Sequence, residues 1–308
     1  MKKRRMGVRQ VRAHYEDWPF PGMEFWSRES LLLLKYLGQW LREDDRAVAK
    51  VIDVGCGTGH TTLALARRFP EVSFLGLDIS RNSLAIARRR ARQFKVPNVR
   101  FANADIRKDM VSFGQFRVVI STGVLHHLEN LRDSFSQVAQ LVEDRGYLVV
   151  WLYGRHGRAK HQLNQQFLRL VTKEATKQQM FLATRIFLEH LGKTYAKDSG
   201  FYTPKGSGED GLAWLLNNPQ WLADQMIPAF EQSVTMPDIL DLFKKNRLCL
   251  VKWFGVSLDL RSYTTSRVLL RLFQKLPFEE KLTALDCLIK PEYYFVAGQK
   301  QEAKEKSR

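Results

Sequence analysis

Three glycines alternate with other residues directly after a short apolar segment that contains Asp53. Gly55, Gly57 and Gly59 form this loop. Glycine lets a ligand approach the backbone closely, because no Cβ intervenes. Nineteen residues beyond Gly59, Asp78 ends a second apolar segment. An acidic side chain at such a position can accept hydrogen bonds from both hydroxyls of a ribose. The spacing therefore indicates a nucleotide-type ligand at the ends of two neighbouring strands.

The glycine spacing distinguishes between two kinds of nucleotide-binding loop. The dinucleotide fingerprint G-x-G-x-x-G fails, because its third glycine would fall on His60 or Thr62. The pattern G-x-G-x-G, led by Asp53, resembles the first motif of class I S-adenosylmethionine-dependent methyltransferases. The resemblance covers about residues 50–152. It implies S-adenosylmethionine as the cofactor, S-adenosylhomocysteine as its product, and no metal.

The resemblance also implies a role for each residue at the ends of the first four strands. The three glycines would let the backbone wrap the methionine part of the cofactor. Asp53 would lie near its ammonium group and Asp78 on its ribose hydroxyls, while Asp105 would lie near the adenine amino group. The full predicted cofactor set is Asp53, Gly55, Cys56, Gly57, Gly59, Asp78, Ile79, Ala104, Asp105, Ser121, Thr122 and Val124.

Two adjacent histidines follow the fourth apolar segment and are the candidates for catalysis. Methyl transfer from a sulfonium is a direct in-line displacement, so the protein must align the reacting atoms and exclude water. A general base is needed only if the acceptor carries a proton at neutral pH. His126 and His127 suit that task, because the ordinary pKa of histidine is near 6.5, and His14 is a weaker candidate. The alternative is one surface histidine and one packed histidine.

Two segments outside the glycine loop point to the acceptor. Residues 11–21 set aromatic side chains beside prolines, and they resemble the VRxxYExxPYP opening of a group of bacterial class I methyltransferases. A strap packed on the core is the alternative. Residues 223–240 resemble a segment of the same group, although Thr235 and Asp238 also have the spacing of a capping box. The predicted substrate-binding residues are Tyr15, Trp18, Tyr153, Arg155, Asp224 and Glu231.

Apolar segments that alternate with amphipathic ones must position these residues. Continuous apolar strands separated by helices indicate a parallel sheet buried on both faces. We predict strands over 50–54, 73–77, 99–102, 116–121, 147–152, 248–256 and 293–297. We predict helices over 27–45, 61–69, 80–94, 131–143, 264–274 and 278–288. The expected fold is α/β and Rossmann-like, with a seven-stranded, mostly parallel sheet, helices on both faces and a helical insertion after the fifth strand.

This pattern divides the chain into five parts. They are an N-terminal strap and helix over the cofactor site (1–48), a cofactor-binding core (49–154), a helical insertion that serves as a substrate lid (155–247), the C-terminal part of the core sheet with two helices (248–299) and a disordered tail (300–308).

The chain is strongly basic, with 49 Lys and Arg against 32 Asp and Glu, a net charge of +17 and a pI near 9.9. Such a charge attracts anions, which include nucleic acid, anionic lipid and acidic small substrates. The basic run over 88–100 is explained by a solvated helix face. An RNA partner stays open through the basic residues Arg155, Arg158, Lys160, Lys173 and Lys177 of the insertion. No Asn-Pro-Pro-Tyr clamp for a flipped base follows the fourth strand.

The three cysteines, Cys56, Cys249 and Cys287, have no zinc-binding spacing and favour a reducing, cytoplasmic location. The apolar run 31–34 is too short to span a membrane. The leading expectation is therefore methyl transfer to a small molecule, with an anionic one among the options. The alternatives are an RNA or protein methyltransferase that uses the basic surface, and a catalytically inactive binding protein of the same fold.

Overall fold

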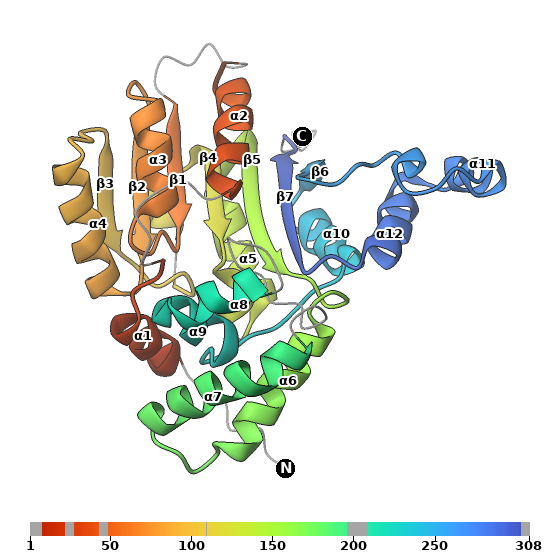
Figure 1. Cartoon of the computed structure of the whole chain (residues 1–308). Helices are drawn as coiled ribbons and strands as arrows, with labels where there is room; N and C mark the ends of the chain where they lie inside the picture. The colour runs from red at the N-terminus through yellow and green to blue at the C-terminus, as the bar shows by residue number, and fades with distance from the viewer. Residues whose placement is uncertain (1–7, 22–27, 43–48, 109, 196–208, 303–308) are drawn as a thin grey trace.

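The computed structural model describes residues 8–21, 28–42, 49–108, 110–195 and 209–302. Its centre is a seven-stranded sheet in the order β3-β2-β1-β4-β5-β7-β6 (Figure 1). The strands are β1 (Lys50–Val54), β2 (Ser73–Asp78), β3 (Val99–Asn103), β4 (Phe116–Thr122), β5 (Val142–Tyr153), β6 (Leu248–Trp253) and β7 (Tyr293–Lys300). Only β7 runs antiparallel to its two neighbours. The predicted fold class is thereby confirmed.

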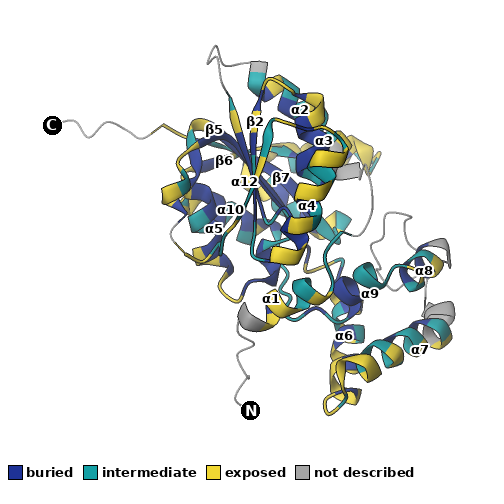
Figure 2. Cartoon of the chain, turned by 90° about the vertical axis from the view of Figure 1, so that its left-hand side faces the viewer, coloured by how far each residue is buried: buried dark blue, intermediate teal, exposed yellow. Residues whose placement is uncertain are grey.

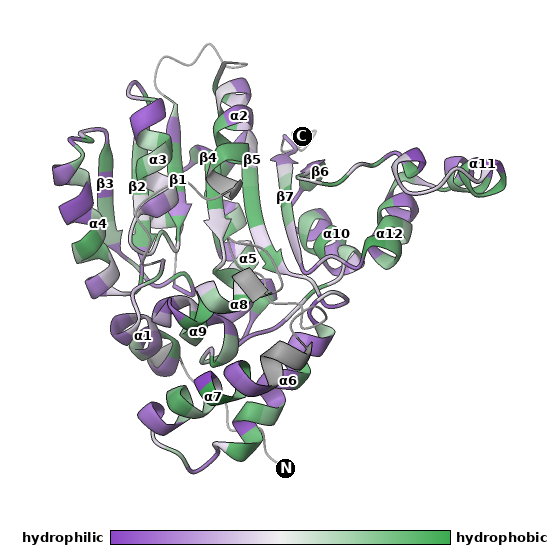
Figure 3. Ribbon diagram, viewed as in Figure 1, coloured by the Kyte–Doolittle hydropathy of each residue, from purple (hydrophilic) through white to green (hydrophobic). Residues whose placement is uncertain are grey.

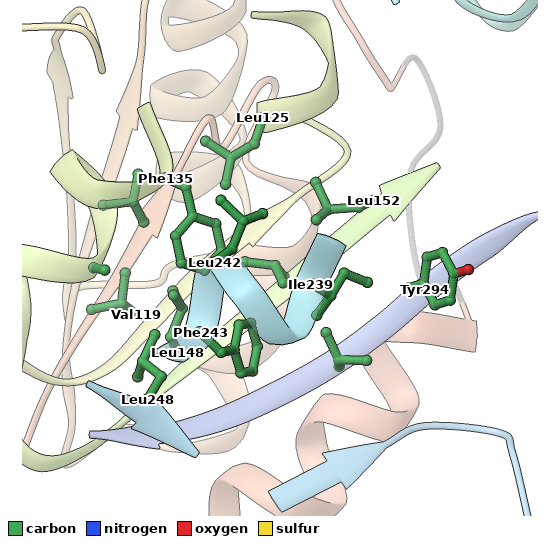
Figure 4. Close-up of a cluster of buried hydrophobic side chains, with 14 of the residues drawn as sticks. Val119, Leu125, Phe135, Leu148, Leu152, Ile239, Leu242, Phe243, Leu248 and Tyr294 are labelled. Carbon is green, nitrogen blue, oxygen red and sulfur yellow. The ribbon is translucent and has the colours of Figure 1, made fainter. Parts of the chain in front are cut away.

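Both faces of the sheet are covered by helices, as the continuous apolar strands predict. Val51 of β1 packs in a cluster with α2 (Arg28–Arg42) and α3 (His60–Arg68). The next residue, Ile52, packs on the opposite face with α5 (Leu131–Gln140), α10 (Met236–Lys245) and α12 (Phe278–Ile289). Figure 4 shows this second cluster, and Figure 2 shows the buried strands enclosed by helices with exposed outer faces. Successive side chains of a strand point to opposite faces, so one apolar strand serves two cores.

Strand β5 starts five residues before its predicted beginning. The predicted strand began at 147, directly after Gly146, because glycine often marks a turn; Gly146 instead lies inside the strand, which begins at Val142. The register with β4 shifts between Phe116 and Val118, and Arg145 has a φ of 62°. The turn signal at these positions therefore marks a β-bulge, which bends a strand without ending it.

A layer of helices lies at the end of the sheet where the parallel strands finish (Figure 1). It consists of α6 (Ala159–Val171), α7 (Lys177–Tyr195), α8 (Glu209–Leu216) and α9 (Pro219–Met226). These helices have an apolar cluster of their own, which includes Leu168, Leu188 and Leu215. Helix α10 packs against the sheet instead, because Ile239 and Phe243 lie in the hydrophobic cluster on one face of the sheet. The separate apolar cluster thus ends before α10.

The N-terminal segment contains a helix that the sequence pattern did not predict, α1 (Val8–Asp17). Ser80 caps α4 (Arg81–Gln93), as predicted, by accepting a hydrogen bond from the backbone of Ser83. Between β6 and β7, α11 (Arg267–Lys275) leads into α12. Of the predicted tail 300–308, Lys300 ends β7 and residues 303–308 lie outside the described residues. No helix among the described residues has both the length and the apolar character needed to cross a membrane.

Candidate functional site

The glycine loop joins β1 to α3 in a conformation that only glycine adopts easily. Gly55, Gly57 and Gly59 have φ values of 82°, 53° and 79°, in the left-handed region. The backbone N–H of Gly55 donates to the carbonyl of Leu77 on β2 at 2.7 Å. A Cβ added at Gly55 would lie 2.3 Å from the side chain of Val124, which follows β4. The loop thus needs glycine for its backbone angles and for the close approach of a neighbouring segment.

Two carboxylates lie beside this loop. Asp78 accepts hydrogen bonds from the backbone N–H groups of Gly57 and Ser80, both at 2.8 Å. Burial raises the pKa of Asp78, although these backbone donors oppose the change. Asp53 is 2% exposed, and the Thr62 hydroxyl donates to it at 2.5 Å. Burial raises the pKa of Asp53 to about 7. A carboxylate oxygen accepts more than one hydrogen bond, so Asp78 fixes the loop and retains acceptor sites for a ligand.

The ends of β3 and β4 complete this edge of the sheet. The carboxylate of Asp105 is held by its neighbour Arg107, through Nε at 3.0 Å and Nη2 at 2.6 Å. Burial raises the pKa of Asp105, but Arg107 outweighs burial and the net change is downward. The fully buried Ser121 hydroxyl donates to the carbonyl of Val54 at 3.0 Å, which joins β4 to β1. The other predicted residues at this edge are buried or half-buried: Cys56, Ile79, Ala104, Thr122 and Val124.

The N-terminal segment lies across the same edge. The carboxylate of Glu16 accepts hydrogen bonds from the backbone N–H groups of Arg81 and Asn82, at 2.9 and 3.0 Å. Thr58 of the glycine loop donates its N–H to the carbonyl of Phe20 at 3.1 Å. Its hydroxyl donates to the carbonyl of Pro21 at 2.7 Å. Helix α1 and the residues after it therefore cover the glycine loop and the start of α4.

A second polar group forms where α1, the segment after β4 and α9 meet. The Tyr15 hydroxyl donates to Asp224 Oδ1 at 3.0 Å, and burial with the charge of Asp224 raises the pKa of Tyr15 well above its usual value. His127 Nε2 lies 3.7 Å from the same carboxylate oxygen. His127 Nδ1 lies 2.8 Å from the carbonyl of Phe230. Since a carbonyl only accepts, Nδ1 carries the proton of the neutral ring and Nε2 has a free lone pair.

A buried ion pair is connected to this group by hydrogen bonds. Arg158 is fully buried and donates Nε and Nη2 to the two carboxylate oxygens of Glu231 at 3.2 and 3.1 Å. It also donates Nη1 to Gln225 Oε1 at 3.1 Å and lies 3.6 Å from the centre of the Tyr153 ring. Gln225 in turn donates to the Tyr153 hydroxyl at 2.8 Å and to Asp224 at 3.1 Å. One hydrogen-bonded network thus runs from the start of α6 to Asp224.

The sequence analysis named Arg158 only as a possible phosphate contact and did not name His161 or Gln165. These three residues lie at helical spacing, so their side chains share one face at the start of α6. His161 Nε2 lies 2.7 Å from the carbonyl of Gln225, and burial lowers the pKa of His161 to about 3. Gln165 donates to Glu231 at 3.0 Å. Their helical spacing is the one signal in the sequence that could have identified them. Because Arg158 is buried, it is not free to meet a phosphate, as the RNA alternative supposed.

Three predicted site residues lie outside the group formed by Tyr15, His127 and Asp224. Arg155 is exposed and donates to Asp238 at 3.1 Å, so it holds the start of α10. Trp18 stacks on Phe181 of α7, with ring centres 5.2 Å apart. His126 is fully buried, with its ring centre 3.9 Å from that of Tyr153. Burial lowers its pKa well below its usual value, so His126 stays neutral.

Comparison with known proteins gives the class of this chain. Residues 45–201, half of the chain, match the family model of a methyltransferase domain. The chain belongs to this family, and its class is the one predicted from the glycine loop, a class I S-adenosylmethionine-dependent methyltransferase. A solved structure with this fold is that of PKMT2 from Rickettsia typhi in complex with AdoHcy, with a TM-score of 0.64 at 16% identity, over 83% of this chain and 49% of that one. This likeness shows the shared fold.

Two relatives show how far the sequence likeness extends. Trans-aconitate 2-methyltransferase of Deinococcus radiodurans is 34% identical over 119 residues, which are 39% of this chain and 43% of the relative. Malonyl-[acyl-carrier protein] O-methyltransferase of a Paenibacillus species is 23% identical over 222 residues, 61% of this chain and 77% of the relative. The chain spans less than half the length of the first curated relatives it matches.

Proposed function

We propose that this chain transfers a methyl group from S-adenosylmethionine to a small-molecule acceptor held between α1, the segment after β4 and α9. The observation that carries this proposal is the position of Tyr15. Its carbonyl accepts a hydrogen bond from the Ser80 hydroxyl at 3.3 Å, beside Asp78. Its own hydroxyl donates to Asp224 in the second polar group. A single residue therefore lies between the edge that would hold the cofactor and the group that would hold the acceptor.

The residues at the sheet edge fit S-adenosylmethionine. Asp78 retains acceptor sites for the ribose hydroxyls, and the Asp53 carboxylate lies at the loop where the ammonium group would bind. Gly123 supports the same assignment, because a Cβ added there would meet no atom within 4 Å. Asp105 would share its carboxylate between Arg107 and the adenine amino group. When bound, the cofactor supplies an electrophilic methyl group on its sulfonium.

The geometry favours His127 over His126 as a base. The Phe230 carbonyl fixes the tautomer of His127 and leaves Nε2 to take a proton from the acceptor. The resulting imidazolium would lie 3.7 Å from the Asp224 carboxylate, which stabilises it. Among the described residues, no carboxylate forms an ion pair with His126 as Asp224 does with His127. Burial disfavours its charged form.

The acceptor side is enclosed by protein, which supports a small acceptor. Asp224 is 4% exposed and His127 is 4% exposed, beneath α1 and the layer α6–α9. We propose that this layer acts as the lid over the acceptor. Two relatives are named for small acids or their carrier-bound form, trans-aconitate and malonyl-[acyl-carrier protein]. A carboxylate acceptor would fit these names and would need no base, whereas an acceptor that carries a proton at neutral pH would use His127.

The experiment that tests this function is calorimetry with S-adenosylhomocysteine. We expect binding by the natural chain and a rise in Kd of about tenfold or more in Asp78→Asn, because a lost hydrogen bond to a charged group is worth about 1.5–3 kcal/mol. Asp144→Asn is the matched control, since Asp144 is an exposed residue of β5 that pairs with Arg247. No binding by the natural chain would refute the function. Equal Kd values in both variants would refute the role of Asp78.

A further inference from the structure

Helix α11 stands apart from the rest of the structure and from the candidate site (Figure 1). None of its residues is buried. Leu270 and Phe273 are half-buried against the core cluster. Val268, Leu269 and Leu272 are instead exposed, by 68%, 52% and 57%. Helix α11 thus has more apolar surface than it packs, and Figure 3 shows hydrophobic residues on this outlying helix.

The polar residues of α11 are all on one side. A helix turns by about 100° per residue, so Arg267, Arg271 and Lys275 form one row along it. All three are exposed, and none forms an ion pair with a carboxylate in the described ranges. Helix α11 contains no acidic residue. Around the helix, the half-buried pair Leu270 and Phe273 is followed by an exposed apolar strip of Val268, Leu269 and Leu272. The basic row comes next.

We define the α11 face as this strip and row together: Val268, Leu269, Leu272, Arg267, Arg271 and Lys275. An exposed apolar strip beside a row of cations matches the boundary between anionic headgroups and acyl chains. We propose that the α11 face binds the surface of an anionic lipid bilayer, so that the chain is a peripheral membrane protein. The net charge of +17 acts in the same direction, because it raises the concentration of the protein near any anionic surface.

A second copy of the chain fits this face less well than an anionic surface does. In a two-fold symmetric dimer the same patch meets itself. Each copy would then bring the cations Arg267, Arg271 and Lys275 to one interface, and α11 itself contains no acidic residue to offset them. An anionic bilayer instead supplies opposite charge to the row and an apolar layer to the strip. The charge pattern therefore selects the bilayer.

The test is sedimentation of the full chain with vesicles of phosphatidylcholine alone, and with vesicles that also contain phosphatidylserine. We expect binding to the second kind only, and weaker binding as salt rises. The double variant Leu269→Glu with Leu272→Glu should lower the binding constant by about tenfold or more, because it removes apolar contact and adds like charge. Arg271→Glu, which leaves the strip intact, should also weaken it.

The matched control is Leu163→Glu with Leu170→Glu, since these residues of α6 are exposed by 64% and 66%. Thermal melting and S-adenosylhomocysteine binding establish that each variant is folded. The proposal is wrong if phosphatidylserine vesicles do not bind the chain, or if the α6 variant loses as much binding as the α11 variant. It is also wrong if the α11 variants bind vesicles normally but convert a dimer to a monomer in sedimentation velocity.

Discussion

The pKa of Asp53 leads to a prediction about the pH dependence of cofactor binding. Burial raises this pKa from its usual 3.8 to about 7. At about 1.4 kcal/mol per pH unit, ionising Asp53 in the free folded protein costs about 4 kcal/mol. Between pH 4 and 7 the folded chain keeps a proton that the unfolded chain has lost. The contribution of Asp53 to stability is therefore full below pH 4, falls as pH rises through this range, and is lost above pH 7.

Cofactor binding should reverse this cost if the ammonium group of the cofactor lies near Asp53. The bound ammonium favours the ionised carboxylate and lowers its pKa, so binding below pH 7 must release a proton. We expect the Kd of S-adenosylhomocysteine to rise by up to about tenfold for each pH unit below 7. Calorimetry at pH 6 in buffers of different ionisation enthalpy should detect about one proton released per ligand bound.

Two variants separate this effect from other pH dependence. Asp53→Asn should bind more weakly above pH 7 and show a flat Kd between pH 5.5 and 7. Thr62→Val removes the hydroxyl that lowers the pKa of Asp53, so it should move the pH dependence to higher pH without flattening it. If the natural chain binds equally well at pH 5.5 and 8, or if Asp53→Asn keeps the full slope, Asp53 does not pair with the ammonium group.

Four further variants test the contacts around the site. Glu16→Ala removes a carboxylate that caps α4, so the free energy of unfolding in urea should fall by about 1 kcal/mol. The Kd of S-adenosylhomocysteine should rise as well. An unchanged Kd would mean that α1 does not support the cofactor edge. Arg158→Met should cost about 3–5 kcal/mol, because it leaves Glu231 buried without its cation. Adding Glu231→Leu should recover most of that loss, and no recovery would contradict the argument. His127→Gln should lower kcat and remove the acidic limb of the pH–rate profile, whereas an unchanged profile would exclude His127 as the base.

The sheet and its cofactor edge could be predicted because their signals are local. Ile52 and Val119 lie in apolar runs with the length of strands, and Ser80 has the chemistry of a helix cap. The three glycines have the positive φ values that a tight loop requires. In each case a few neighbouring residues determine the conformation, so a pattern in the sequence is sufficient.

The polar network could not be predicted in full, because its partners are distant in the sequence. Arg158 resembles a surface residue of a basic helix, and its burial depends on Glu231, which lies 73 residues later. Tyr15 and Asp224 were each predicted, but nothing in the sequence pairs two residues 209 positions apart. The bulge near Gly146 was missed for another reason, since a glycine that bends a strand has the same local signal as one that ends it.

Helix α1 explains why the two halves of the candidate site need each other. Consecutive residues of its last turn contact different parts of the molecule: Tyr15 bonds to Asp224 of α9, Glu16 caps α4, and Asp17 pairs with Lys177 of α7. The Glu16 contact lies at the sheet edge, and the other two lie on the helical layer α6–α9. If α1 left the sheet edge, the carboxylate beside His127 would lose its tyrosine donor in the same step. The hydrogen bond from Tyr15 to Asp224 therefore forms only while α1 lies against this edge of the sheet, so one helix supports both parts of the candidate site.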